Sequence, residues 1–226
     1  MSDRRLATFA SLLGLSFLVC AMVGARVIYS GNLHFVSLLW NLFLAWIPFV
    51  LALAVHDGFT RGVRRLPLIV GGVLWLLFLP NAPYIVTDLK YVGEWLGAPI
   101  WYDAVLASAA AGIGLVLGFA SLYLIQTVVR RTAGALNAWF FVLGTLALSS
   151  FGVYLGRFQR WNSWDVFMQP GALFADIWSA ATNPTAHLDA AAVAVLFTAF
   201  LAATYLVFYS FLSASGSPSR EPGPRG

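Results

Sequence analysis

The stretch LPLIVGGVLWLLFLPNAPYIV, residues 66–86, decides the fold. It is almost entirely apolar, and it is long enough to cross the hydrocarbon core of a bilayer, which takes about 20 helical residues. Pro80 and Pro83 interrupt it near its end. Because proline lacks a backbone N–H and clashes with the carbonyl four residues earlier, the helix should break there. In lipid, the freed carbonyl groups must be met by neighbouring helices, water or a ligand.

Five further stretches have the length and apolar character of membrane spans. They are Leu6–Ile28, Phe35–Val55, Ala104–Val129, Leu136–Leu155 and Leu188–Leu212. The chain is 60% hydrophobic and only 10% charged, whereas soluble domains carry roughly a quarter charged residues. We therefore predict an all-α polytopic membrane bundle of six transmembrane helices, with the third helix broken near its outer end. Residues 1–212 form one domain, and residues 213–226, rich in Pro, Gly and Ser, form a disordered cytoplasmic tail.

The basic residues predict how the bundle is oriented, because cytoplasmic loops are enriched in Lys and Arg. One side holds Arg4, Arg5, Arg61, Arg64, Arg65, Arg130, Arg131, Arg220 and Arg225. The opposite side holds Arg26, Lys90, Arg157 and Arg160. This asymmetry predicts a cell-membrane protein with both termini in the cytoplasm. It also explains the basic pI, and without a nucleic-acid-binding motif we expect the lipid bilayer, and no nucleic acid, as a partner.

The break in the third span carries polar residues, with Asn81 between the prolines and Tyr84 and Asp88 after them. One interpretation is a capped helix end, in which the Asn81 amide pairs with its own backbone. The other is a broken helix that lines an outward-facing polar pocket. Asn41, in the second span, either forms an interhelical contact or lines the same pocket.

A second polar stretch, GRFQRWNSWD, follows the fifth span. If the helix continues, Arg157 and Arg160 share a face. Guanidinium groups bind phosphate or carboxylate with paired hydrogen bonds, so the two arginines are candidates for an anion site together with Asn162. Alternatively, they contact lipid headgroups or pair with Asp88 and Asp165.

Two features outside these stretches predict packing. The segment PGALFADIWSAATNP, residues 170–184, reads as a short amphipathic interfacial helix in the last outer loop, placed to act as a lid. Its apolar face holds Leu173, Phe174, Ile177, Trp178 and Ala181. Gly114-xxx-Gly118 and Gly152-xxx-Gly156 predict close helix packing.

Metal and cofactor chemistry has no sequence support. Cys20 is the only cysteine, and no HxxxH or HExxH spacing is present. We expect no metal and no cofactor.

Three strings together resemble a family. LFLPNAPYIVTDL, YLGRFQRWNSWD and WNLFLAWIPF are similar to an uncharacterised family of prokaryotic membrane proteins, domain of unknown function 1361, over about residues 30 to 212. The resemblance implies a multi-pass inner-membrane protein. It implies no substrate and no catalytic residue.

Three functions remain open from the sequence. The first is an enzyme or binding protein for a lipid or lipid-linked anion in the outer leaflet, with Asp88 or Asp165 as a catalytic base. Its substrate-binding candidates are Asn41, Asn81, Tyr84, Arg157, Arg160 and Asn162. The second is a small transporter with its site at the broken span. The third is a non-enzymatic membrane partner or assembly factor that docks through its outer loops.

Overall fold

The computed structural model describes residues 3–94, 97–182 and 188–214, and every element in these ranges is a helix. In chain order they are α1 (Asp3–Ser30), η1 (His34–Val36), α2 (Ser37–Thr60), α3 (Arg65–Phe78), α4 (Asn81–Tyr84), η2 (Ile85–Tyr91), α5 (Ile100–Ala133), α6 (Ala135–Phe158), α7 (Asp165–Met168), α8 (Pro170–Thr182) and α9 (Leu188–Ala214). Six helical stretches are long and apolar enough to cross a membrane. The predicted all-α bundle with six spans is confirmed.

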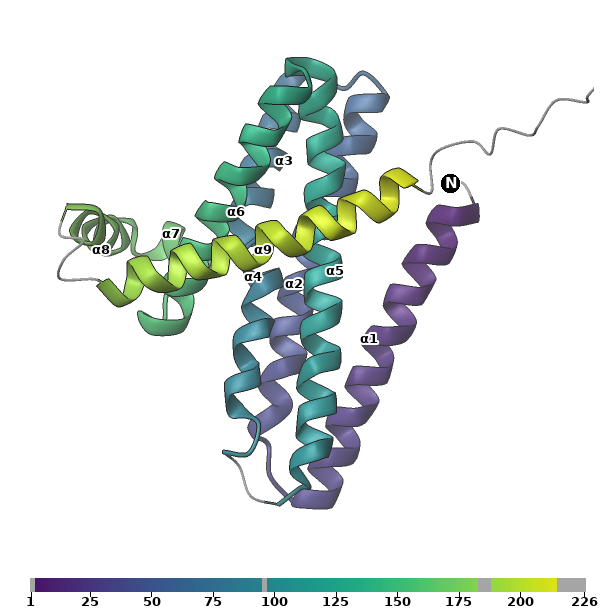
Figure 1. Cartoon of the computed structure of the whole chain (residues 1–226), viewed down its shortest axis with the longest axis vertical. Coiled ribbons are helices and arrows are strands. Elements are labelled where there is room, and N and C mark those ends of the chain that lie inside the picture. The colour runs from purple at the N-terminus through teal and green to yellow at the C-terminus, as the bar shows by residue number, and fades with distance from the viewer. Residues whose placement is uncertain (1–2, 95–96, 183–187, 215–226) are drawn as a thin grey trace, which may run out of the picture.

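The long helices α1, α2 and α5 run along the long axis of the molecule (Figure 1). The α2–α3 and α5–α6 connections lie at one end, and the α1–α2 and η2–α5 connections lie at the other (Figure 1). One core cluster joins α1, α2 and α5 through side chains such as Val19, Ala45 and Leu106. A second cluster joins α3, α5, α6 and α9, with Trp75 and Leu146 among its buried members. The α2–α3 and α5–α6 connections, with Arg61, Arg64, Arg65, Arg130 and Arg131 in or beside them, therefore share one end.

Helix α9 crosses the bundle diagonally, and α8 projects to one side (Figure 1). A buried hydrogen bond of 2.5 Å from the Tyr205 hydroxyl to Oε1 of Gln126 joins α9 to α5. The rings of Phe119 and Trp139 lie edge-on to Tyr205. An amide in hydrocarbon usually finds a partner on another helix, and this contact anchors α9.

The predicted interfacial segment is helical, as α8. Leu173 is buried and Ile177 half-buried, whereas Phe174 and Trp178 are exposed and stack on each other at 6.2 Å. The predicted apolar face is therefore divided between a side that packs inward and a side that does not. Of the predicted tail, Ser213 and Ala214 end α9, and residues 215–226 lie outside the described ranges.

The predicted break in the third span is confirmed. Helix α3 ends at Phe78, and α4 and η2 continue the span as short segments. The backbone N–H of Ala82 donates to the carbonyl of Leu79 at 3.1 Å, which is the carbonyl that Pro83 leaves without its α-helical donor. The Asn81 amide donates to the carbonyl of Phe78 at 2.8 Å. The carbonyls of Leu79 and Phe78 at the break are thus satisfied from within the chain.

The break is wedged between small residues on α5 and α6. These residues are Gly114, Gly118, Gly152 and Gly156. A Cβ added to Gly114 would lie 2.5 Å from the carbonyl oxygen of Ala82, and one added to Gly152 would lie 2.7 Å from Cγ of Pro80. The prediction of close helix packing at both glycine pairs is confirmed, and the element that they receive is the broken span.

Candidate functional site

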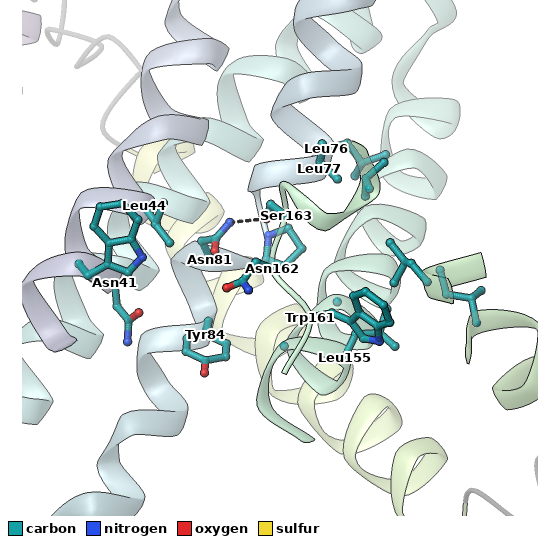
Figure 2. Close-up of a pocket in the computed structure, with 17 residues that line it drawn as sticks. Asn41, Leu44, Leu76, Leu77, Asn81, Tyr84, Leu155, Trp161, Asn162 and Ser163 are labelled. Carbon is teal, nitrogen blue, oxygen red and sulfur yellow. Dashed lines mark hydrogen bonds between the residues drawn. The ribbon is translucent and has the colours of Figure 1, made fainter. Parts of the chain in front are cut away.

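A cavity of about 260 Å³ lies beside the break in the third span. Figure 2 shows the residues that line it, which come from α2, α3, α4, α6, the segment 161–163, α7 and α8. They are Trp40, Asn41, Leu44, Leu76, Leu77, Pro80, Asn81, Tyr84, Gly152, Leu155, Gly156, Trp161, Asn162, Ser163, Val166, Leu173 and Ile177. The two polar stretches of the sequence therefore meet at one cavity.

A direct contact joins the two stretches across the cavity wall. Besides the carbonyl of Phe78, the Asn81 amide donates to Oγ of Ser163 at 2.9 Å, and Figure 2 shows this bond beside Asn162. Asn81 thus caps the broken helix and also reaches the segment after α6. The two interpretations of Asn81 are compatible, because it bonds to its own backbone and also lines the cavity; that the cavity faces outward stays a prediction.

Asp88 and Arg157 form an ion pair behind this cavity. Nη2 of Arg157 donates to Oδ1 of Asp88, and Nδ2 of Asn41 donates to Oδ2 of the same carboxylate at 2.7 Å. The side chains of Asp88 and Arg157 are only 6% and 8% exposed. Asn41 also lines the cavity, so it connects the ion pair to the cavity wall.

The other two guanidinium nitrogens of Arg157 also donate hydrogen bonds. Its Nε donates to Oγ1 of Thr87 at 2.7 Å, and its Nη1 donates to the hydroxyl of Tyr91 at 3.2 Å. The guanidinium carbon lies 4.2 Å from the centre of the Tyr84 ring, a cation–π distance. Arg157 therefore holds η2 against α6, in agreement with the interpretation that it pairs with Asp88.

Arg160 is placed differently from Arg157. Helix α6 ends at Phe158, so the shared helical face expected for a continuing helix does not form. Arg160 adopts a φ of +62°, in the left-handed region that non-glycine residues rarely occupy. Its side chain is exposed. The helix has ended before Arg160, and the three residues that follow it, Trp161, Asn162 and Ser163, line the cavity.

Asp165, the second candidate carboxylate, takes part in a local turn. Its Oδ2 accepts hydrogen bonds from the backbone N–H of Asn162 at 2.7 Å and from the Asn162 amide at 3.2 Å. Such side-chain-to-backbone bonds stabilise turns. Asp165 shapes the segment that carries Asn162 and is not among the residues that line the cavity.

Asp88 borders a second cavity, of about 200 Å³, toward the α1–α2 connection. Its other lining residues are His34, Phe35, Ser37, Leu38 and Tyr91. The ion pair of Asp88 and Arg157 thus lies between the two cavities. Within the described ranges, no group of three or more His, Cys, Asp or Glu side chains is arranged to hold a metal ion.

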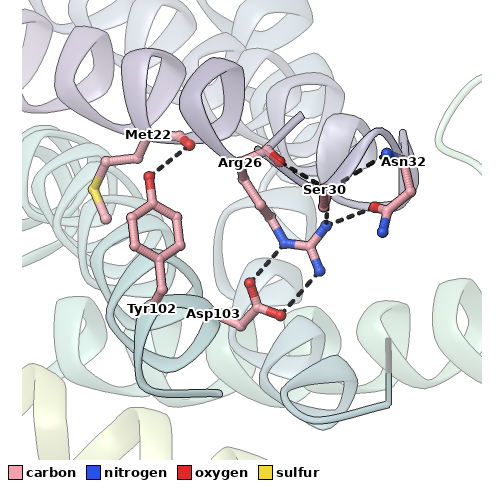
Figure 3. Close-up of polar contacts among 6 residues, drawn as sticks. All are labelled: Met22, Arg26, Ser30, Asn32, Tyr102 and Asp103. Carbon is pink, nitrogen blue, oxygen red and sulfur yellow. Dashed lines mark hydrogen bonds and ion pairs between the residues drawn. The ribbon is translucent and has the colours of Figure 1, made fainter. Parts of the chain in front are cut away.

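A buried ion pair that was not predicted from the sequence joins α1 to α5. Arg26 Nε and Nη2 donate to the two carboxylate oxygens of Asp103 at 2.6 and 3.0 Å, and Nη1 donates to Oδ1 of Asn32 at 2.6 Å (Figure 3). Both charged side chains are 1% exposed or less. The guanidinium also lies 4.2 Å from the ring of Phe35, which borders the second cavity. A signal was available, because an arginine inside a predicted span calls for a buried partner.

The comparisons with known proteins give a family but no function. The family model "Protein of unknown function (DUF1361)" matches residues 40–211, which is more than half of the chain, so the chain belongs to this family. No curated protein matches the chain. No solved structure matches it.

Proposed function

We propose that this membrane protein binds a lipid or a lipid-linked molecule in the cavity beside the broken third span. The cavity wall carries this proposal, because it combines aliphatic side chains with amides and two hydroxyl-bearing residues in a chain that has six apolar spans. Ligand sites generally pair a mostly apolar lining with a few polar groups that fix orientation. The alkyl part of an amphiphile can contact the aliphatic side chains of such a wall, and its polar head can bond to the amides and hydroxyls.

The proposed site faces the extracytoplasmic side of a cell membrane. Supporting this orientation, the α2–α3 and α5–α6 connections and the helix ends beside them carry exposed arginines at one end of the bundle. They are Arg61, Arg64, Arg65, Arg130 and Arg131. Basic loops generally stay in the cytoplasm. Both termini are then cytoplasmic.

Arg160 is the residue that we assign to an anionic group of the ligand. It is exposed and directly precedes Trp161, which lines the cavity. Arg157 is less suited to this role, because its donors are taken by Asp88, Thr87 and Tyr91. An anionic headgroup would therefore stay at the mouth of the cavity.

The geometry supports binding better than catalysis. A general base must reach the proton that it removes. Asp88 is held by Arg157 and Asn41, and Asp165 is held by Asn162. We therefore propose a binding protein, and place an enzyme that uses either carboxylate second.

Binding of dodecyl phosphate to the protein in phosphatidylcholine nanodiscs tests the proposal. We expect saturable binding above the partition into empty nanodiscs. Arg160→Gln should weaken it about threefold, since exposed ion pairs contribute roughly 0.2–1 kcal/mol. Arg131→Gln, at the other end of the bundle, is the matched control and should leave binding unchanged. Binding that never saturates, or that both variants weaken equally, would refute the proposal.

A further inference from the structure

The cavity beside the break has uncharged walls. None of the described residues that line it is Lys, Arg, Asp or Glu. Four charged side chains contact the wall from behind. Asp88 and Arg157 neutralise each other behind Asn41 and Tyr84. The carboxylates of Asp165 and Asp176 accept hydrogen bonds from Asn162 and Trp161. A charged group inside the cavity would lose hydration without meeting an opposite charge, which is costly. The part of a ligand that enters should therefore be neutral.

The polar groups of the wall offer both donors and acceptors. Asn81 uses both amide hydrogens, on Phe78 and Ser163, which leaves its Oδ1 as an acceptor. Asn41 uses one amide hydrogen on Asp88 and Asn162 uses one on Asp165, so each retains one N–H and its Oδ1. The Ser163 hydroxyl accepts from Asn81 and keeps its own hydrogen to donate.

This mixture discriminates between ligand groups. A phosphate or carboxylate oxygen only accepts, so it could use the donors of the wall but would leave the three amide oxygens unmatched. A hydroxyl group both donates and accepts, and several hydroxyls on one small ring would use the donors and acceptors of the wall together. Unmatched polar groups in such a site are unfavourable, so an alkyl group alone would also bind less well.

Two indole rings complete the wall. Trp161 donates from Nε1 to Asp176 on α8 at 2.9 Å, which fixes the orientation of its ring. Trp40 packs edge-on against Trp164 at 6.2 Å. Trp161 and Trp40 both line the cavity. Indole faces offer large apolar area with little loss of conformational freedom, which suits the C–H faces of a sugar ring.

We infer that the group bound inside the cavity is a neutral, hydroxyl-rich ring of the sugar or cyclic-polyol class, carried by a lipid. This inference rests on the proposed function and specifies its ligand. The hydroxyls meet Asn41, Asn81, Asn162 and Ser163, and the ring packs on Trp161. The alkyl chain follows the aliphatic part of the wall. Any anionic link between ring and lipid lies outside, at Arg160.

Binding of radiolabelled octyl glucoside, below its micellar concentration and in phosphatidylcholine nanodiscs, tests the inference. We expect saturable binding, and 1-octanol should not compete at the same concentration. Trp161→Leu removes the stacking face and should weaken binding about tenfold, given the combined loss of area and ring contact. Trp178→Leu, on the exposed side of α8, is the matched control and should bind like the unaltered protein.

A second variant separates ring stacking from folding. Trp161→Phe keeps an aromatic face but loses the hydrogen bond to Asp176. It should bind octyl glucoside within about threefold of the unaltered protein if stacking matters most. If Trp161→Leu does not fold, Trp161→Phe and Ser163→Ala carry the test, and Ser163→Ala should weaken glucoside binding severalfold.

The outcomes distinguish the inference from the proposed function. Saturable glucoside binding that depends on Trp161 supports both. Saturable dodecyl phosphate binding with no saturable glucoside binding overturns the inference and leaves the proposed function standing. Glucoside binding that Trp161→Leu leaves unchanged also overturns the inference. If neither probe binds saturably, the proposed function fails with it.

Discussion

At the residue scale, the contact between Asp88 and Arg157 determines the structure around the site. Asp88 receives hydrogen bonds from Arg157 and Asn41, and Arg157 also engages Thr87 and Tyr91. Burying an ion pair is costly unless the remaining donors and acceptors are met. These additional partners are what make a buried pair at this position tolerable.

Removing one member of this pair should therefore destabilise the protein. Asp88→Asn leaves the Arg157 charge without a counter-ion, and we expect a loss of about 3–5 kcal/mol in the free energy of unfolding, as for other broken buried pairs. The double variant Asp88→Asn with Arg157→Met should recover part of that loss. Asp165→Asn, in a half-buried local turn, is the matched control. Reversible unfolding in detergent micelles gives these free energies.

Equal losses in Asp88→Asn and Asp165→Asn would contradict this account of the ion pair. The account would also be contradicted if the loss of unfolding free energy in the double variant equalled the sum of the losses in Asp88→Asn alone and Arg157→Met alone. Residues in direct contact are coupled, so their losses should not add.

At the element scale, the broken span depends on the absence of side chains opposite it. Gly114 on α5 and Gly152 on α6 leave room for Ala82 and Pro80, which belong to the break. Close approach of backbones through small residues is a common way of joining membrane helices. In this protein, the close approach of the break to α5 and α6 also places Asn81 within hydrogen-bonding distance of Ser163.

A methyl group at either glycine should push the break aside. Gly114→Ala places a Cβ 2.5 Å from the carbonyl of Ala82, and we expect a loss of about 1–3 kcal/mol in stability, typical of overpacking. Gly152→Ala should behave similarly. Gly112→Ala and Gly144→Ala, on the same helices but with no atom within 4 Å of the added Cβ, should be neutral or slightly stabilising, because alanine favours helix.

Thermal unfolding of the four purified variants measures these effects. An unchanged midpoint for Gly114→Ala and Gly152→Ala would show that the break does not pack closely against α5 and α6.

At the scale of the whole molecule, the sequence predicted what depends on composition and local chemistry. The six spans follow from apolar length, and the break follows from Pro80 and Pro83. The predicted span Leu136–Leu155 ends close to the observed end of α6 at Phe158. The left-handed backbone of Arg160 was not predicted, because nothing in the neighbouring sequence signals it. The pairing of Arg26 with Asp103 was not predicted either, because the two residues are 77 positions apart and only the assembled bundle brings them together.

The candidate site, too, was predictable only where local sequence carries a signal. The sequence singled out Asn81, Arg157 and Asn162, and left open whether Arg157 binds a ligand or pairs with an aspartate. The structure pairs it with Asp88. The apolar part of the cavity wall, from α2, α3, α6 and α8, carries no sequence signal, because such side chains look like any other lipid-facing or packed residue.

Crosslinking of Asn81 to Ser163 most directly tests the central claim that the broken span and the segment after α6 form one site open to the extracytoplasmic side. In a Cys20→Ala background, we expect Asn81→Cys and Ser163→Cys to be joined within one chain by a short thiol crosslinker. A membrane-impermeant thiol reagent, added first to intact cells, should prevent the crosslink. Asn81→Cys paired with Asn137→Cys, at the far end of the bundle, should not crosslink. Absence of the first crosslink, or blocking only after the cells are permeabilised, would contradict the account.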